Sequence, residues 1–435
     1  MFDLCVWCAM FIMFDEKGDF YLSGGTEEKF MKKYLMMMLA AGLICTGCGK
    51  KADAPEAEET AAPAEAAAPA EAAADADEFA EAQKKLDGVD FTDEGLDKLF
   101  AAPDAMTPVE YEALMLSFSK CDMKDGKPDV GCISHKSVPK HRKARKMDGK
   151  AIYGVHKKMI RHKHPAVRGY AYDQFENLED EAQIKEILEQ MKNDKDSYVL
   201  SRGIRAMKNS LKHSKDLTDF VKGNLKHEHK DVRISVANAM GSRWNKDVEG
   251  LVDGLRTLLA DTDVDVRKTA CQMAGSLGND TIVPDMVKVI DNQEDKAQGE
   301  CAKALVAMWY DFPAHENTSE AAYKAYLDYL KKAPRTANLP EWQAITNLKN
   351  MGKAKFDAWK AKATYFKAEE LVAALADIAK DDAASKLART NAIDVIAVHG
   401  TKADLEGMKE AIAASTSKDA KAVQESLDKA IAKAK

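Results

Sequence analysis

A short pattern recurs along the middle of the chain and constrains its fold more than any other feature. In each copy a polar turn leads into an apolar residue, an arginine and a run of small and apolar residues. Clear copies stand at 164–171, 197–206, 229–236 and 263–270, so the pattern returns at intervals of about 31 to 34 residues. A weaker copy lies at 297–301 and a last one at 387–393. A fixed period of this length indicates an array of structural repeats.

Between the copies lie second segments, such as 184–191 and 251–259, whose apolar residues fall at three- and four-residue spacing. That spacing predicts helices with one buried face. Each unit is therefore expected to be a helical hairpin, and stacked hairpins share one continuous core. Aromatic residues make up only 7% of the chain, which favours an Ala-rich helical protein over a β-sandwich. We predict an all-α solenoid.

The copy Asp263-Val264-Asp265-Val266-Arg267-Lys268-Thr269-Ala270 resembles the Asp-x-x-Val-Arg-x-x-Ala pattern of HEAT repeats in a short-period form. The usual HEAT period is longer, about 40–47 residues. The resemblance is clear over about 155–310 and fainter over 340–435. It implies that the loop aspartate and the motif arginine bond between successive repeats. The structural ladder residues would then be Arg168, Arg202, Arg233, Arg267 and Arg389.

The N-terminal region predicts export. Met31 is followed by two lysines and a short apolar run, so we interpret 31–47 as a signal peptide and 1–30 as a mis-called start, with a real N-terminal extension as the alternative. Cys45-Thr46-Gly47-Cys48 resembles the lipobox of bacterial lipoproteins, although that family usually has Leu where Cys45 stands. The resemblance implies that Cys48 carries a lipid and is the first mature residue.

Residues 48–82 are rich in Ala, Pro and Glu and contain almost no large apolar side chain. Such a segment cannot offset the entropy of ordering, so we expect a disordered tether. Residues 83–150 are expected to form a helical cap, 151–315 the HEAT-like repeats, and 316–435 divergent helical repeats with a C-terminal helix. Thr107-Pro108-Val109-Glu110 is a strong helix start within the cap.

Cys121 and Cys132 bracket a loop, and in an oxidising envelope we expect them to form a disulfide. The loop does not fit a calcium site, because Cys121 and Met123 fall where oxygen ligands are needed. Cys271 and Cys301 lie on neighbouring repeats, either as buried thiols, which we favour slightly, or as a disulfide between repeats.

Basic residues crowd the segment from 136 to 168. Its candidate anion-binding side chains are Lys140, Arg142, Lys143, Arg145, Lys146, Lys157, Lys158 and Arg161. An exported protein rarely meets nucleic acid, so lipid head groups, an acidic envelope polymer or the acidic tether are better partners. A solvated basic face without a ligand is the simplest interpretation.

The sequences His162-Lys163-His164 and His227-Glu228-His229 precede two of the repeats. No further ligand stands at fixed spacing, so we interpret them as polar loops, predict no metal site, and expect no cofactor. Each tryptophan of the folded part is expected to serve core or cap packing, except that 309–313 could line a groove.

The leading hypothesis is a lipid-anchored scaffold without enzymatic activity in the bacterial cell envelope. The sequence favours the outer membrane as its location. Its concave face would bind an unknown protein partner. The alternatives are a binder of anionic polymer or lipid through 136–168, and a lyase-like or chaperone-like activity on a HEAT scaffold, which rests on analogy of fold. We find no Gly-rich phosphate loop, nucleophile elbow or His-Glu-x-x-His motif.

Overall fold

The structure is a computed structural model. It describes residues 76–101, 106–144, 148–292, 296–310, 318–332, 345, 348 and 353–434, which all fall within one compact unit. Residues 1–30, the expected signal peptide, Cys48 and the tether up to residue 75 lie outside the described residues. So do Arg145, Lys146 and Trp342.

The N-terminal part of the described chain is a set of short helices followed by one small hairpin. Its elements are η1 (Ala76–Phe79), α2 (Ala80–Leu86), α3 (Asp93–Leu99), α4 (Pro108–Leu116), η2 (Ser117–Lys120), β1 (Met123–Lys124), β2 (Lys127–Pro128), α5 (Ser134–Ala144) and α6 (Gly149–Met159). The predicted start of α4 is confirmed: Thr107 accepts a bond from the Glu110 N–H, and the Glu110 carboxylate accepts one from the Thr107 N–H. The turn of the hairpin holds Asp125 and Gly126 at φ values of 50° and 72°, which suits a tight two-residue connection.

Five helix pairs follow, and they confirm the all-α solenoid. They are α7 (Pro165–Tyr172) with α8 (Glu181–Asn193), α9 (Ser197–Ala206) with α10 (Lys215–Gly223), α11 (Lys230–Met240) with α12 (Leu251–Leu259), α13 (Val264–Leu277) with α14 (Val283–Asp291), and α15 (Gln298–Trp309) with α16 (Glu320–Lys332). The turns within three of the pairs contain η3 (Met207–His213), η4 (Arg243–Asn245) and η5 (Asp280–Ile282).

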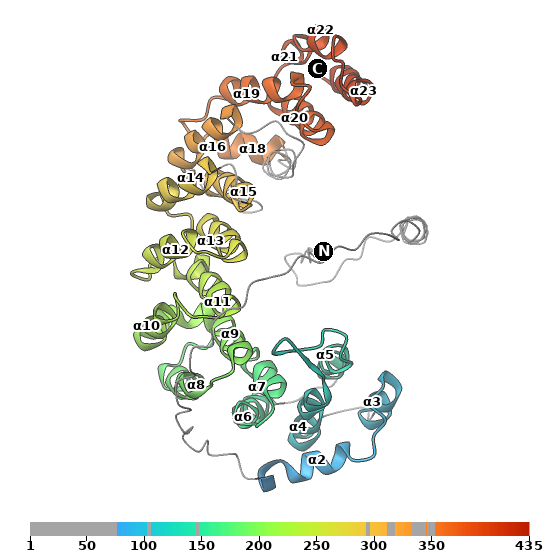
Figure 1. Cartoon of the computed structure of the whole chain (residues 1–435), viewed down its shortest axis with the longest axis vertical. Helices are drawn as coiled ribbons and strands as arrows, with labels where there is room; N and C mark the ends of the chain where they lie inside the picture. Colours follow the sequence, from blue (N-terminus) through green and yellow to red (C-terminus); the bar gives the residue numbers. More distant parts are fainter. Residues whose placement is uncertain are drawn as a thin grey trace, which may run out of the picture. The chain divides into compact units, whose positions relative to one another are not determined.

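The pairs stack in two rows. Helices α7, α9, α11, α13 and α15 pack in succession, each against the next, and we call them the first-helix row. Helices α8, α10, α12, α14 and α16 form the second-helix row beside it (Figure 1). Each chain segment therefore contacts mainly the repeats next to it, as in other solenoids.

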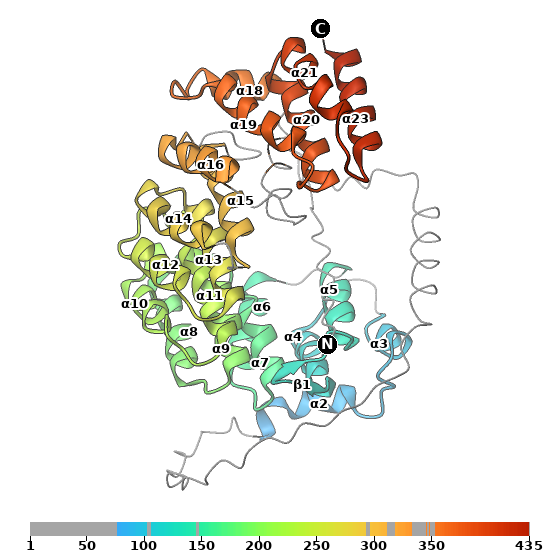
Figure 2. The ribbon, with the colours of Figure 1, turned by 45° about the horizontal axis from the view of Figure 1, so that its top comes forward.

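The C-terminal part continues with α18 (Lys353–Lys360), α19 (Ala368–Lys380), α20 (Lys386–His399), α21 (Lys402–Glu406), α22 (Lys409–Ala413) and α23 (Ala420–Lys433). Helix α20 packs between α19 and α23, an arrangement that can be followed in Figure 2. An aromatic cluster joins α18, which precedes α19 and α20, to the repeat formed by α15 and α16. Trp309 lies 5.2 Å from Tyr323 and 5.4 Å from Trp359, measured between ring centroids.

The core follows from the helical spacing of apolar residues. In α12, Leu251, Leu255, Leu258 and Leu259 all fall on the buried side. Each fully buried side chain of this size contributes about 1.5–3 kcal/mol relative to an exposed one. Because a single hairpin exposes that side, the stabilisation is realised only when repeats stack.

Three sequence expectations need correction. The tether was expected to reach residue 82, but helix begins at Ala76 and both Phe79 and Ala82 are buried. The boundary at 315 falls between α15 and α16, which form one pair. Trp309 was expected to be able to line a groove, yet it is fully buried, because it joins three helices of the aromatic cluster.

Candidate functional site

Arg168 and Arg233 each stand four residues after a helix N-cap and connect their repeat to the next. Arg168 follows the N-cap His164 of α7 and binds Asp194 through Nε at 2.7 Å and Nη2 at 3.1 Å. Arg233 follows the N-cap His229 of α11 and binds Asp261 in the same way, at 2.7 and 3.0 Å. Two-pronged pairs of this kind are strong and directional.

The same arginines also hold their own loops. Nη1 of Arg168 donates to the carbonyls of His162 and Lys163 at 3.0 and 2.9 Å. Nη1 of Arg267 donates to the equivalent carbonyls of Asp261 and Thr262 at 2.7 and 3.1 Å. One side chain thus satisfies carbonyl groups that the loop would otherwise leave unpaired.

The last predicted ladder residue, Arg389, is four residues after the N-cap Ser385 of α20 and fully buried. Its guanidinium donates to the Ala379 carbonyl at 2.9 Å, to Asp382 at 3.0 Å and to the Ser417 hydroxyl at 2.9 Å. The faint C-terminal repeat therefore keeps the register of the clear ones.

Arg202 does not occupy the ladder position, which corrects the sequence prediction. The N-cap of α9 is Asp196, so the residue four positions later is the buried Leu200. Arg202 lies two residues further on and forms an ion pair with Asp173 of the preceding repeat. The two arginine positions are close enough in sequence that spacing alone did not separate them.

The histidine pairs are loop caps. Nδ1 of His162 accepts the N–H of His164 at 3.0 Å, and Nδ1 of His227 accepts the N–H of His229 at 3.1 Å. In the other loops Asp194 and Asp261 accept the corresponding N–H groups of Asp196 and Asp263, at 3.0 and 2.8 Å. Imidazole and carboxylate therefore fill one structural position, two residues before the N-cap.

The choice between them follows the preceding repeat. Aspartate stands where the preceding ladder residue is an arginine, as in Arg168–Asp194 and Arg233–Asp261. His227 stands after the repeat that has Leu200, so no ladder arginine of the preceding repeat can form the bidentate pair with this position. A neutral imidazole caps the same N–H without placing a carboxylate that lacks its bidentate partner in a half-buried loop.

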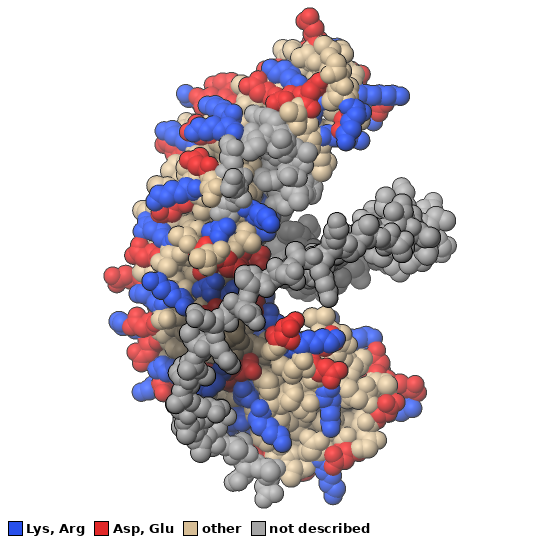
Figure 3. Space-filling view, in the orientation of Figure 1, with Lys and Arg blue, Asp and Glu red and all other residues tan. Residues whose placement is uncertain are grey.

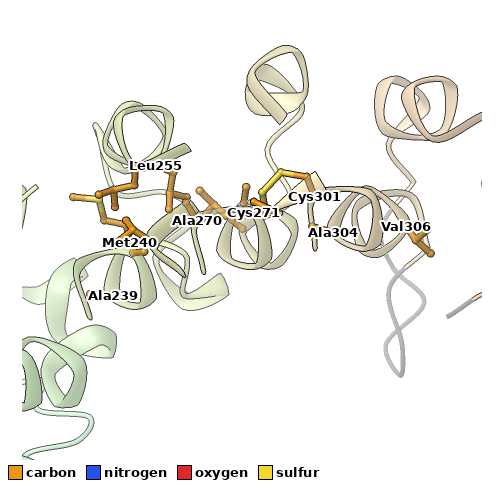
Figure 4. Close-up of a cluster of buried hydrophobic side chains, with 14 of the residues drawn as sticks. Ala239, Met240, Leu255, Ala270, Cys271, Cys301, Ala304 and Val306 are labelled. Carbon is orange, nitrogen blue, oxygen red and sulfur yellow. A yellow bond between two sulfur atoms is a disulfide. The ribbon is translucent and has the colours of Figure 1, made fainter. Parts of the chain in front are cut away.

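Both cysteine pairs of the described residues form disulfides. Cys121 and Cys132, 5.5 Å apart at Cα, close the β1–β2 hairpin. Cys271 and Cys301, 4.7 Å apart at Cα, join α13 to α15, contrary to the slight preference for buried thiols (Figure 4). Cys301 is four residues after the N-cap Ala297. In this repeat a covalent bond therefore occupies the arginine position.

Four basic side chains of the segment 136–168 form ion pairs with an acidic cap, defined as the described residues between 76 and 120. Two of the pairs join the cap to α5, one joins it to α6, and one joins it to the residues just after α6. They are Lys136–Asp93 at 2.6 Å, Lys140–Asp97 at 2.6 Å, Lys158–Glu112 at 2.6 Å and Arg161–Glu78 at 2.8 Å. Figure 3 likewise shows basic and acidic side chains intermixed on the face in view.

The other anion-binding candidates are placed differently. Lys157 pairs with Glu186 of α8 at 2.5 Å, and Arg142 donates to the side-chain amide of Gln174. Lys143 is exposed in the last turn of α5. Lys140, Lys158 and Arg161 thus join the acidic cap, and Lys157 joins α8, so part of the basic segment has a docking role within the chain.

Four histidines meet four aromatic rings of the acidic cap. The centroid separations are Phe79–His162 4.9 Å, Phe100–His141 5.5 Å, Tyr111–His156 5.5 Å and Phe118–His135 5.1 Å. The Tyr111 hydroxyl also hydrogen-bonds Nε2 of His156 at 2.8 Å. Burial lowers the pKa of His156 to about 3 and that of His162 to about 4. The imidazoles of His156 and His162 are therefore neutral when the cap is docked.

The turns inside the repeats form a second edge, which sequence reasoning missed. Nδ2 of Asn209 donates to Oδ1 of Asn177 at 2.7 Å, and the Ser242 hydroxyl donates to Oδ1 of Asn209 at 2.9 Å. Beside this chain of bonds Trp244 is 60% exposed, with the Arg243 guanidinium 5.0 Å from its ring centroid. The expectation that Trp244 packs in a core or cap is wrong. The only sequence signal was its place just after a helix end.

A shallow groove of about 90 Å³ opens at this edge, between the turns of three successive repeats. Its walls are Asn177, Glu179, Asn209, Lys212, His213 and Trp244. Within the described residues no cluster of three or more histidine, cysteine or acidic side chains is arranged to hold a metal ion.

None of the described helices is both long enough and apolar enough to cross a membrane.

Comparison with known proteins supports the repeat assignment. A family model described as HEAT repeats matches residues 217–306, which carry the Arg233–Asp261 pair and the Cys271–Cys301 disulfide. No curated protein matches the chain. Among solved structures the chain is similar to an engineered protein, with 15% identity, a TM-score of 0.38, and coverage of 82% of this chain and 99% of that one. It is also similar to Kap121p, with 14% identity, a TM-score of 0.35, and coverage of 81% and 33%.

The ladder rule makes a direct prediction for the repeat that lacks its arginine. Leu200→Arg alone places a guanidinium on α9 without its bidentate carboxylate, and His227→Asp alone places a carboxylate in the following loop without its bidentate guanidinium. Each change should destabilise local structure by about 1–2 kcal/mol. Together the two substitutions should create the bidentate pair. The double variant should then be at least about 1.5 kcal/mol more stable than the sum of the two single effects predicts. Native-state hydrogen exchange of α9 and α11 measures both effects.

Arg389→Met provides the reference, since it breaks an existing ladder contact far from both positions. Its effect, measured in α20 and α23, should not depend on the residues at 200 and 227. If the effects of the two single substitutions add within about 0.5 kcal/mol, an arginine and an aspartate at these positions do not stabilise each other, and the ladder rule is contradicted.

Acid should loosen the cap before it loosens the repeats. The unfolded histidine binds a proton near pH 6.5, whereas His156 and His162, packed against the docked cap, do so only near pH 3 and 4. The opened state therefore binds more protons, and stability falls as pH drops from about 6.5 towards 4. Each such histidine contributes up to about 1.4 kcal/mol per pH unit. Amide exchange in α4 and α6, corrected for intrinsic rates, measures this slope.

Residues 251–291 contain no histidine and serve as the internal control. His156→Gln should reduce the pH slope in α4 and α6 while keeping an acceptor for Tyr111. Equal slopes in α4 and in the control region would contradict the prediction.

Proposed function

We propose that this protein is a scaffold without catalytic activity, held in the bacterial cell envelope by a lipid on Cys48, that binds a protein partner through its first-helix row. The observation that supports it most is that neighbouring helices of this row are bonded to one another. Arg202 pairs with Asp173, Lys230 with Asp265 at 2.9 Å, and Gln272 donates to Glu300 at 2.9 Å.

A surface fixed in this way suits binding. Half-buried apolar and aromatic side chains lie along the row, one on each of α9, α11 and α13: Tyr198, Ile234 and Met273. Because the helices are already ordered, little conformational entropy is lost when a partner docks. Stacked repeats also offer a contact surface longer than a single compact domain of similar size.

Two observations support an envelope location. The segment 31–47 has the layout of a signal peptide, and Cys48 stands at the lipobox position. The described part of the chain holds two disulfides, and disulfides persist mainly in oxidising compartments. The partner is then a protein of the same compartment and not a nucleic acid.

Partner binding can be tested by a charge reversal. Arg205 is exposed in α9, three residues after Arg202. Arg205→Glu should lower recovery of a stoichiometric partner from detergent-solubilised envelopes at least five-fold. Lys185→Glu makes a similar change on an exposed position of α8, in the second-helix row, and should leave recovery unchanged. Equal recovery with both variants would remove the first-helix row as the binding surface.

Lipid anchoring has its own test. Cys48→Ser should abolish labelling by a radioactive fatty acid and move the protein from the membrane to the soluble fraction. Cys45→Ser, three residues earlier, should retain the label. Labelling of the Cys48→Ser variant, or membrane retention without any label, would contradict the anchor.

A further inference from the structure

Trp244 is an outlier among the tryptophans of the described chain. Trp309 and Trp359 are buried in the aromatic cluster, whereas Trp244 exposes 60% of its surface at η4. Exposing an indole to water forgoes the stabilisation that burial would give. Neither the arginine ladder nor the first-helix row uses it.

The groove beside Trp244 is polar apart from the indole. Its walls supply two amides, a carboxylate, an ammonium group and an imidazole, from Asn177, Asn209, Glu179, Lys212 and His213. Nε2 of His213 is shielded from solvent and has no hydrogen-bond partner within the described residues. A shielded, unpaired polar atom in a groove wall is rare, because it costs free energy.

The walls are also fixed in place. The Asn177–Asn209 and Asn209–Ser242 bonds tie three turns together at 2.7 and 2.9 Å. Asn245, next to Trp244, donates to the Lys208 carbonyl at 2.5 Å and the Ala239 carbonyl at 3.2 Å. The Arg243 guanidinium lies over the indole. A ligand would meet a preformed surface.

We propose that this groove binds a carbohydrate, with one sugar ring packed on the face of the Trp244 indole that Arg243 leaves open. A pyranose ring has an apolar face of C–H groups, which matches an exposed indole. Its hydroxyls both donate and accept hydrogen bonds, which matches a wall of amides, carboxylate, ammonium and imidazole.

The two obvious alternatives fit the groove less well. The centre of a protein interface is enriched in apolar side chains and depleted of charge, but Trp244 is the one large apolar residue that lines this groove. A simple anion would make no use of the indole and would face the Glu179 carboxylate.

The test uses the mature chain with tetramers of N-acetylglucosamine and of glucose as probes, followed by titration calorimetry and tryptophan fluorescence. At least one probe should bind saturably. Trp244→Ala should weaken that binding at least ten-fold, Trp244→Phe less, because it keeps an aromatic face, and His213→Ala about three-fold. Leu387 is exposed on α20 at 47%, so Leu387→Ala is the matched control and should bind as the wild type does.

The proposal is overturned if no probe binds the wild type at millimolar concentration, or if Trp244→Ala binds a probe as tightly as the wild type does. If the wild type binds no sugar but Trp244→Ala loses a co-purifying protein, Trp244 is a protein contact instead. The proposal is independent of partner binding by the first-helix row, so Trp244→Ala should not alter the effect of Arg205→Glu.

Discussion

The guanidinium placed four residues after a helix N-cap is the contact on which the stack depends. It binds the carbonyls of its own loop and a carboxylate or hydroxyl of the next loop, as Arg168 and Arg389 show at opposite ends of the array. Apolar burial holds the helices together, but burial has no direction. The bidentate arginine adds direction to the contact between neighbouring loops in the repeats that have it.

Where the arginine is absent, the chain substitutes other chemistry at the same position. Leu200 contributes packing, and the following loop carries a neutral histidine. Cys301 contributes a covalent bond to the preceding repeat. The acidic cap joins the array by yet another means, with carboxylates on lysines and aromatic rings on imidazoles. The interfaces between units therefore differ in their sensitivity to salt, acid and reductant.

The fold was predictable from sequence because it rests on local periodicity. The intervals between Arg168, Arg233 and Arg267 and the apolar spacing within α12 need no knowledge of distant contacts. The misassigned Arg202 shows the limit, because only the N-cap Asp196 fixes the register and a two-residue offset leaves the spacing plausible. The pairing of Lys136 and Lys140 with α3 was not predictable, since charge counts along a chain do not show which carboxylates fold back. The exposure of Trp244 was not predictable either, because burial depends on contacts between residues distant in sequence.

The Cys271–Cys301 bond has a mechanical consequence. In a one-dimensional array, unfolding that begins at a free end spreads from unit to unit, because each unit is stabilised only by its neighbours. A covalent link between α13 and α15 keeps these two helices together even when the hydrogen bonds around them open. Fraying that starts in the C-terminal helices would therefore meet a link that the opening of hydrogen bonds cannot break. If a pulling force passes through both cysteines, the disulfide carries it. Residues 272–300 between them are then shielded from extension, while the helices on either side can still unravel.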